Sequence, residues 1–151
     1  MIDIEDFKKS IGKKSRLLGI DPGKVRIGLA ICDENKVVST PLKTIIKKNN
    51  SNFINEIKAI IEENNIKGII VGNPINMDGS SGPSTQSAKD FVKFLSKNIS
   101  LPISMWDERL SSEGAFNISS NLDINVSKKV KKLDQNAASF ILQGAIDYIR
   151  R

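Results

Sequence analysis

The order in which strand and helix patterns follow one another is the feature that most constrains the fold of this chain. Three strand-like runs come first, and tight polar turns such as Asp33-Glu34-Asn35 join them, which favours an antiparallel meander. Helix and strand patterns then alternate, as they do in βα units with parallel strands. The sequence therefore predicts one mixed α/β sheet with helices packed on its faces, although this order alone fits more than one α/β arrangement.

The predicted bounds follow from hydrophobic period and from capping and turn residues. The meander strands are expected at Arg16–Asp21, Val25–Ile31 and Lys36–Ile46. The later elements are expected as helices over Ser51–Asn65, Pro83–Asn98 and Ser111–Ile118, strands over Gly68–Gly72 and Leu101–Trp106, and a last helix that starts at Asp134. We expect a polar lead-in with one helical turn over residues 1–14 and a loop over residues 119–132. A single domain is expected over residues 15–151.

The absence of histidine limits the chemistry that the chain can perform. Without imidazole, Ser-His-Asp hydrolysis and histidine-ligated zinc are excluded, and the lone Cys32 excludes a cysteine-rich zinc site. Carboxylates remain, and these suit hard, oxygen-ligated cations. The sequence shows no signal-peptide pattern and no apolar run near the roughly 20 residues that span a bilayer, so a cytoplasmic protein is expected.

The net charge is +6, from 23 basic and 17 acidic side chains. Such an excess favours a polyanionic partner through counterion release, although an AT-rich genome would also enrich lysine. Four lysines, Lys128, Lys129, Lys131 and Lys132, stand directly ahead of Asp134. A charge run is commonly only a solvated surface, but beside a carboxylate it indicates contact with phosphates.

Asp21, Glu108 and Asp134 stand where sites form in α/β proteins, at strand ends and at the start of a helix. Each has an ordinary structural explanation, because Asp21 can stabilise a turn, Glu108 can pair with Arg109, and Asp134 can cap a helix. If the first, fourth and fifth strands lie parallel and side by side, the three acids come together. Clustered carboxylates repel unless cations neutralise them, and one or two Mg²⁺ or Mn²⁺ ions would do so.

Four motifs occur in order along the chain, at Leu18–Ala30, Val71–Gly79, Asp107–Ser112 and Leu133–Ala138. Together they resemble the YqgF/RuvX family, a bacterial branch of the RNase H-like superfamily whose members are described as Holliday junction resolvases or pre-16S rRNA maturation nucleases. The resemblance covers about residues 15–149. It implies an RNase H-like fold with a five-stranded mixed sheet, in which Asp21, Glu108 and Asp134 are the catalytic and metal-binding acids.

The resemblance and the charge pattern also predict residues that contact nucleic acid. These are Lys24, Arg26, Asn73, Asn76, Arg109, Lys128, Lys129, Lys131 and Lys132. Simple solvation of the surface is the alternative for the basic residues among them. The family usually has an apolar residue where Asn73 stands.

A metal-dependent nuclease is the leading functional hypothesis, with 5′-end maturation of pre-16S rRNA as its task and the ribosome as a further partner. The rRNA assignment rests on the resemblance alone, since the residues themselves indicate only phosphodiester cleavage. The alternatives are a Holliday junction resolvase, which should be a dimer, and a non-catalytic nucleic-acid-binding module. Nucleotide handling by an actin-like fold needs a second, duplicated domain, which 151 residues cannot supply. The residues leave open whether the protein is a monomer or a homodimer.

Overall fold

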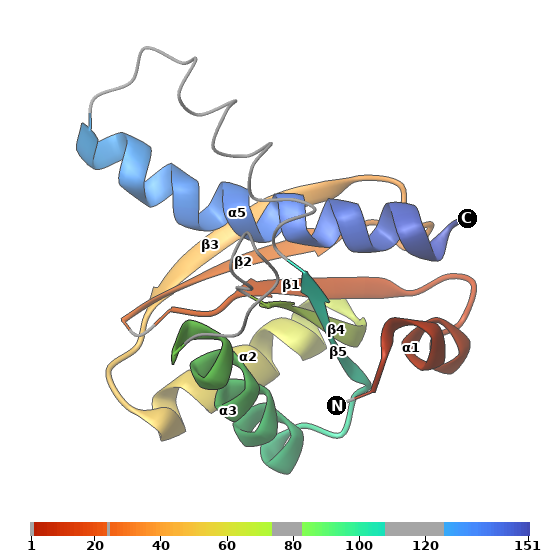
Figure 1. Cartoon of the computed structure of the whole chain (residues 1–151), viewed down its shortest axis with the longest axis horizontal. Helices are drawn as coiled ribbons and strands as arrows, with labels where there is room; N and C mark the ends of the chain where they lie inside the picture. The colour runs from red at the N-terminus through yellow and green to blue at the C-terminus, as the bar shows by residue number, and fades with distance from the viewer. Residues whose placement is uncertain (1, 24, 74–82, 108–125) are drawn as a thin grey trace.

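A computed structural model of the chain describes residues 2–23, 25–73, 83–107 and 126–151, and in residues 83–85 and 126–135 it describes the helical backbone only. The elements are α1 (Ile4–Ser10), β1 (Arg16–Asp21), β2 (Arg26–Cys32), β3 (Ser39–Ile46), α2 (Asn50–Asn64), β4 (Ile66–Asn73), α3 (Pro83–Asn98), β5 (Ile103–Asp107) and α5 (Val126–Ile149). Helices α2 and α3 lie on one side of the sheet, and α5 crosses the other side (Figure 1).

The sheet has the strand order β3-β2-β1-β4-β5. β2 pairs antiparallel with both β1 and β3, whereas β4 pairs parallel with both β1 and β5. The predicted meander and the predicted pair of parallel neighbours are therefore confirmed. The carboxyl ends of β1, β4 and β5 meet at one edge of the sheet, which we call the C-terminal edge and which ends in Asp21, Asn73 and Asp107.

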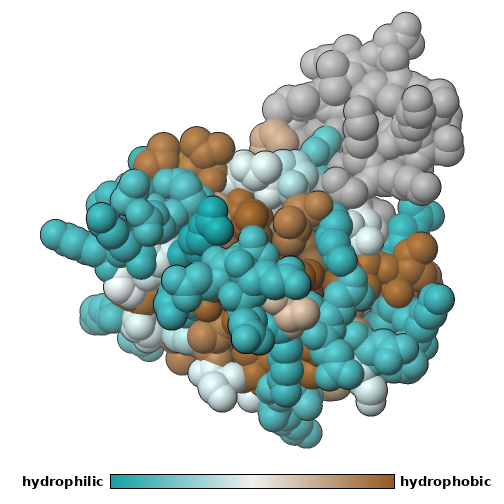
Figure 2. Space-filling view, turned by 180° about the vertical axis from the view of Figure 1, so that it is seen from behind, coloured by the Kyte–Doolittle hydropathy of each residue, from teal (hydrophilic) through white to brown (hydrophobic). Residues whose placement is uncertain are grey.

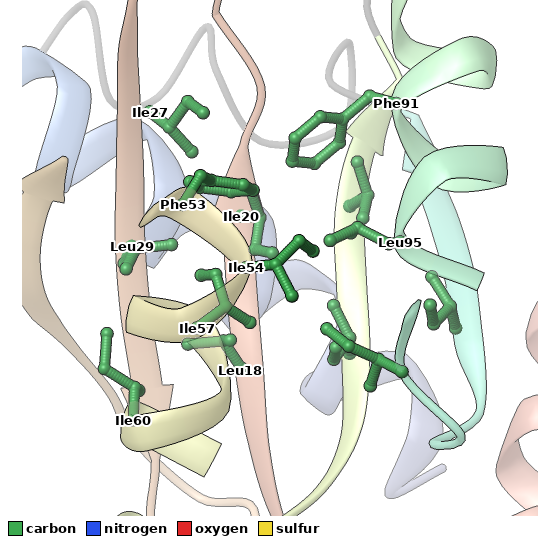
Figure 3. Packing of buried hydrophobic residues seen from close by; sticks show 14 of the residues in the cluster. Leu18, Ile20, Ile27, Leu29, Phe53, Ile54, Ile57, Ile60, Phe91 and Leu95 are labelled. Atoms are coloured by element: carbon green, nitrogen blue, oxygen red, sulfur yellow. The ribbon is translucent and has the colours of Figure 1, made fainter. Parts of the chain in front are cut away.

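Alternating side chains along β1 build a core on each face of the sheet. Leu18 and Ile20 are fully buried in the cluster that the sheet shares with α2 and α3, whereas Leu17 belongs to the cluster that includes Leu142 of α5. Figure 3 shows the apolar side of α2, with Ile57 near its centre, lying on β1 and β2. Because both faces of β1 are covered, this strand is central and carries its last residue to a fixed place at the C-terminal edge.

The helix α2 begins and ends within one residue of its predicted bounds because its caps are local. The Asn49 side chain accepts a hydrogen bond of 2.8 Å from the backbone N–H of Asn52, which satisfies one of the first free donors of the helix. At the other end Asn65 adopts a left-handed backbone with φ of 54°, a conformation that terminates helices. β1 and α3 have the predicted bounds.

The predicted start of the last helix at Asp134 is wrong, because α5 begins at Val126. The prediction of a loop over residues 119–132 is accordingly wrong for 126–132, and 119–125 lie outside the described residues. Val126, Val130 and Leu133 stand at the helical spacing i, i+4 and i+7 ahead of Asp134, and the prediction missed this stripe among the lysines. Lysine also has a high helix propensity, so a helix that is nucleated by packing further along can extend through it.

Strand β3 begins at Ser39 rather than at the predicted Lys36 because the turn before it is longer. One Asp33 carboxylate oxygen accepts hydrogen bonds of 2.8 Å from the backbone N–H groups of both Val37 and Val38, and Lys36 has a left-handed φ of 58°. The predicted helix over Ser111–Ile118 lies outside the described residues. Within the described ranges, no helix has the length and apolarity needed to cross a membrane.

Candidate active site

Polar side chains end the three parallel strands at the C-terminal edge. Asp21 ends β1, Asn73 ends β4 and Asp107 ends β5. Asn73 lies directly opposite Asp107 in the β4–β5 register, and Ile20 lies opposite Val71 in the β1–β4 register. Carboxylates therefore stand on both sides of β4, in the kind of crevice where open α/β sheets carry their sites.

Asp21 lies on the face of the sheet that α5 covers. Its neighbour Ile20 packs into the core with α2 and α3, so side-chain alternation turns Gly19 and Asp21 to the other face. The helix α5 approaches β1 closely at Gly19, where an added Cβ would stand 2.7 Å from Cβ of Leu142 and 3.1 Å from the carbonyl oxygen of Ala138. The lack of a side chain at Gly19 is thus what lets α5 rest against β1, two residues before Asp21.

A row of facing residues extends from Asp21 across the meander. Asp21 lies opposite Gly28 of β2, and Gly28 lies opposite Thr44 of β3. Arg26, the first residue of β2, is exposed and stands two residues beyond Gly28. The structure therefore places the predicted contact residue Arg26 beside the C-terminal edge, close to Asp21.

Helix α5 carries five further predicted site residues in its N-terminal half. Figure 1 shows that this half points toward the end of β1, while the C-terminal end of α5 lies near α1; there, Lys8 Nζ donates a 2.9 Å hydrogen bond to the Arg151 carbonyl. The residues that α5 carries are Lys128, Lys129, Lys131, Lys132 and Asp134, and the structure describes their helical backbone only. An N-cap role for Asp134 is excluded because α5 begins eight residues earlier, at Val126.

Four predicted site residues lie outside the described residues. They are Lys24, Asn76, Glu108 and Arg109. Among the side chains that the structure does describe, no three carboxylates, cysteines or histidines stand together. That finding does not bear on the three predicted acids, because Glu108 and the side chain of Asp134 are not among the described groups.

Two buried oxygens at this end of the sheet lack a hydrogen-bond partner within the described part of the chain, Oδ1 of Asn73 and Oγ1 of Thr44. Thr44 shares the face of Asp21, whereas Asn73, like the core residue Val71, lies on the face of α2 and α3. A buried acceptor without a partner is costly, and an amide oxygen is also a ligand that hard cations accept. The oxygen donors at the C-terminal edge thus fit Mg²⁺ or Mn²⁺. The family resemblance indicated Asn73 but not Thr44, because only the register of β3 shows that Thr44 lies across Gly28 from Asp21.

The arrangement of sheet and helices is found in a known class of proteins. The structure of Thermus thermophilus RuvC in complex with a Holliday junction substrate superimposes with a TM-score of 0.52 at 11% identity, covering 89% of this chain and 94% of that one. Identity at that level shows the fold alone. The protein thus has an RNase H-like fold, as predicted.

The sequence itself identifies the family. The profile of the RuvX family, described as Holliday junction resolvase, matches residues 15–148. A relative from Pelagibacter ubique (strain HTCC1062) is 60% identical over 149 residues, with 99% of both chains covered. Another from Zymomonas mobilis (strain ATCC 31821) is 37% identical over 93% of this chain and 86% of its own. Both carry the name of a proposed pre-16S rRNA nuclease. The chain belongs to the RuvX family, and it is a nuclease that hydrolyses phosphodiester bonds.

Proposed function

We propose that this protein is a divalent-metal-dependent nuclease that matures the 5′ end of pre-16S rRNA, with Asp21, Glu108 and Asp134 as its catalytic acids. The contact of α5 with β1 at Gly19 carries the proposal. Asp134 precedes Ala138 by one helical turn, or about 6 Å along the helix. Asp21 follows Gly19 by two strand residues, or about 7 Å. The N-terminal half of α5 points toward the end of β1 (Figure 1). Both Asp134 and Asp21 therefore lie on the same side of the Gly19 contact, toward the C-terminal edge.

The third acid stands in the chain directly after β5. Glu108 directly follows Asp107, the last residue of β5, and β5 ends at the same edge as β1 with only β4 between them. Three carboxylates gathered there would hold one or two Mg²⁺ or Mn²⁺ ions. When bound, such an ion polarises a phosphate oxygen and lowers the pKa of an attacking water.

The protein's own residues would orient the substrate for that reaction. Arg26 beside the C-terminal edge and the lysines of α5 would bind phosphates on either side of the cut and fix its register. Water would then attack phosphorus in line, and the P–O3′ bond would break to leave a 5′ phosphate and a 3′ hydroxyl. Lys24, Asn73, Asn76 and Arg109 would add contacts to the RNA. A pre-16S rRNA substrate would place the activity in the cytoplasm, during ribosome assembly.

The test is cleavage of a 5′-labelled pre-16S rRNA fragment in Mg²⁺, Mn²⁺ or EDTA. We expect EDTA to abolish cleavage and Asp21→Asn, Glu108→Gln and Asp134→Asn each to lower the rate by more than the 10–100-fold typical of residues that only support metal ligands. Glu63→Gln, at an exposed position of α2, is the matched control and should keep the wild-type rate. Full activity in Asp21→Asn would refute the proposed site.

Resolution of four-way DNA junctions is the second candidate. The family description and the fold likeness to RuvC favour it. A resolvase must present two sites to one junction, so it should be a dimer in solution and should cut a junction symmetrically. Cleavage of the rRNA fragment by a monomer, with an intact four-way junction under the same conditions, would decide for the rRNA nuclease.

A further inference from the structure

Two large aliphatic side chains are exposed where the β2–β3 ladder reaches the C-terminal edge. Val25 is 60% exposed and Ile46 is 63% exposed. Ile46 lies opposite Arg26 in the register, and the backbone N–H of Lys47 donates a 2.8 Å hydrogen bond to the carbonyl oxygen of Val25. These four residues and Lys48 form what we call the β2–β3 tip.

The register fixes the distance between the β2–β3 tip and Asp21. Asp21, Gly28 and Thr44 form one row across three strands, and Ile46 lies two residues beyond Thr44 on β3. Two strand spacings and two strand residues place Ile46 about 12 Å from Asp21. Ile45 packs into the core with α2, so alternation turns Ile46 to the sheet face that carries Asp21. Val25 stands two residues before the core residue Ile27 and lies toward the face of α2 and α3, so the two side chains stand on either side of the end of the ladder.

The surroundings of the tip are basic. Lys47 is held by two aromatic rings, with its Nζ 6.0 Å from the ring centre of Phe53 and 5.6 Å from that of Phe94. Glu56, which lines the same cavity as Lys47 and Lys48, is paired with Lys43 at 2.5 Å. The charges of Lys47 and of the exposed Lys48 therefore attract anions to this place.

A shallow cavity of about 230 Å³ opens beside Ile46. Its walls include Ile46, Lys48 and Phe53. The cavity is smaller than the 300–1,000 Å³ of typical small-molecule sites, and α2 contributes Asn52, Phe53 and Glu56 to its wall. On the face seen from behind, apolar groups stand in separate patches among hydrophilic ones (Figure 2).

Aliphatic side chains between cations match the chemistry of a nucleic acid, in which apolar base faces lie between phosphates. Proteins that kink or open a duplex insert such aliphatic residues between base steps. A stable protein–protein interface would bury about 1,200 Å² or more, far more than the two side chains of the tip offer. The chemistry of the tip therefore favours a nucleic acid over a second protein chain.

We propose that the β2–β3 tip packs Val25 and Ile46 against the last exposed base pair of an RNA duplex, so that the enzyme selects a boundary between paired and unpaired nucleotides. This inference rests on the proposed function, because it takes RNA as the substrate. A duplex end held against Ile46 lies about 12 Å from Asp21, the length of a few stacked nucleotides. Cleavage is then expected at a constant short distance from the boundary.

The test measures binding without cleavage. In EDTA, we would titrate wild-type protein and the Val25→Thr/Ile46→Thr variant with an RNA duplex that ends in a single-stranded overhang, labelled with 2-aminopurine at the last pair. Threonine keeps the β-branch and removes apolar surface at both positions. The matched control is Val37→Thr/Val38→Thr, because these valines are 46% and 56% exposed at the far end of the same two strands.

We expect the tip variant to bind the overhang duplex about tenfold more weakly, a loss of about 1.4 kcal/mol, and to lose the change in 2-aminopurine fluorescence that wild-type binding produces at the last pair. The control should match wild type in both measurements. Equal losses in both variants, or none in the tip variant, would overturn the inference. So would a change from dimer to monomer in the tip variant by sedimentation, since the tip would then be a protein interface. Because no cleavage is needed, failure of the catalytic proposal would leave these results intact.

Discussion

Replacing Gly19 by alanine tests whether the contact between α5 and β1 sets the geometry of the site. The new Cβ would stand 2.7 Å from Cβ of Leu142 and 3.1 Å from the Ala138 carbonyl oxygen. Neither atom is the flexible end of a side chain, so α5 itself must move. Restoring a separation of 3.4 Å requires a displacement of about 0.7 Å, and overpacking of this kind costs about 1–3 kcal/mol.

The expected effect on activity is larger than the effect on stability. A displacement near 1 Å between catalytic groups can cost about 10²-fold in rate, and Gly19 lies two residues before Asp21 on the strand that α5 contacts. We therefore expect the urea midpoint of Gly19→Ala to fall with an unchanged slope. The rate of rRNA cleavage should fall about 100-fold at a temperature where the variant is fully folded.

Two other glycines provide matched controls. Gly68→Ala would bring a Cβ within 2.7 Å of the Phe7 ring, but it lies near the start of β4, away from the C-terminal edge. It should lose stability and keep its rate. Gly12→Ala meets only Ser15 Oγ at 3.5 Å and should change neither. Wild-type stability in Gly19→Ala, or equal loss of rate in Gly19→Ala and Gly68→Ala, would refute the argument that this contact sets the site.

Three further predictions concern the turn, the core and the basic segment. Hydrogen bonds from the backbone N–H of Val38, and then of Val37, lower the pKa of Asp33 below its ordinary 3.8. Its ionised form therefore stabilises the fold above that pH, and the stability is lost as pH falls through the lowered pKa. Asp33→Ala should lower the urea midpoint at neutral pH and leave it near wild type in strong acid; an equal loss at both would contradict this. Ile57→Ala removes a fully buried side chain of α2 and should cost about 2–5 kcal/mol, against less than about 0.5 kcal/mol for the exposed Lys58→Ala. Both are measured by thermal or urea unfolding. The last change replaces four lysines of α5 by glutamine, namely Lys128, Lys129, Lys131 and Lys132. It should weaken RNA binding, and the slope of log K against log salt should fall by up to about 0.9 for each phosphate that the protein no longer neutralises. An unchanged slope would show that these lysines do not contact the RNA.

Local signals explain why most elements could be predicted. β1 and α3 have the predicted bounds, and α2 is shifted by one residue because Asn49 and Asn65 cap it. Caps and apolar periods act over a few neighbouring residues, so a single sequence displays them. The start of α5 was missed although Val126, Val130 and Leu133 stand at helical spacing before Asp134, because the lysines between them make this stripe narrow and the signal weak.

The sequence by itself determined the chemistry that is available: carboxylates without histidine, an excess of positive charge, and four motifs that placed the chain in its family. It also determined the mixed sheet, since strand and helix periods are local properties. Only the tertiary structure decided which residues surround Asp21. The facing of Thr44 across Gly28, the approach of α5 at Gly19 and the exposed pair Val25 and Ile46 beside the C-terminal edge all depend on strand register and on the packing of helix against sheet. Both are set by contacts between residues far apart in the chain, so no local pattern carries them.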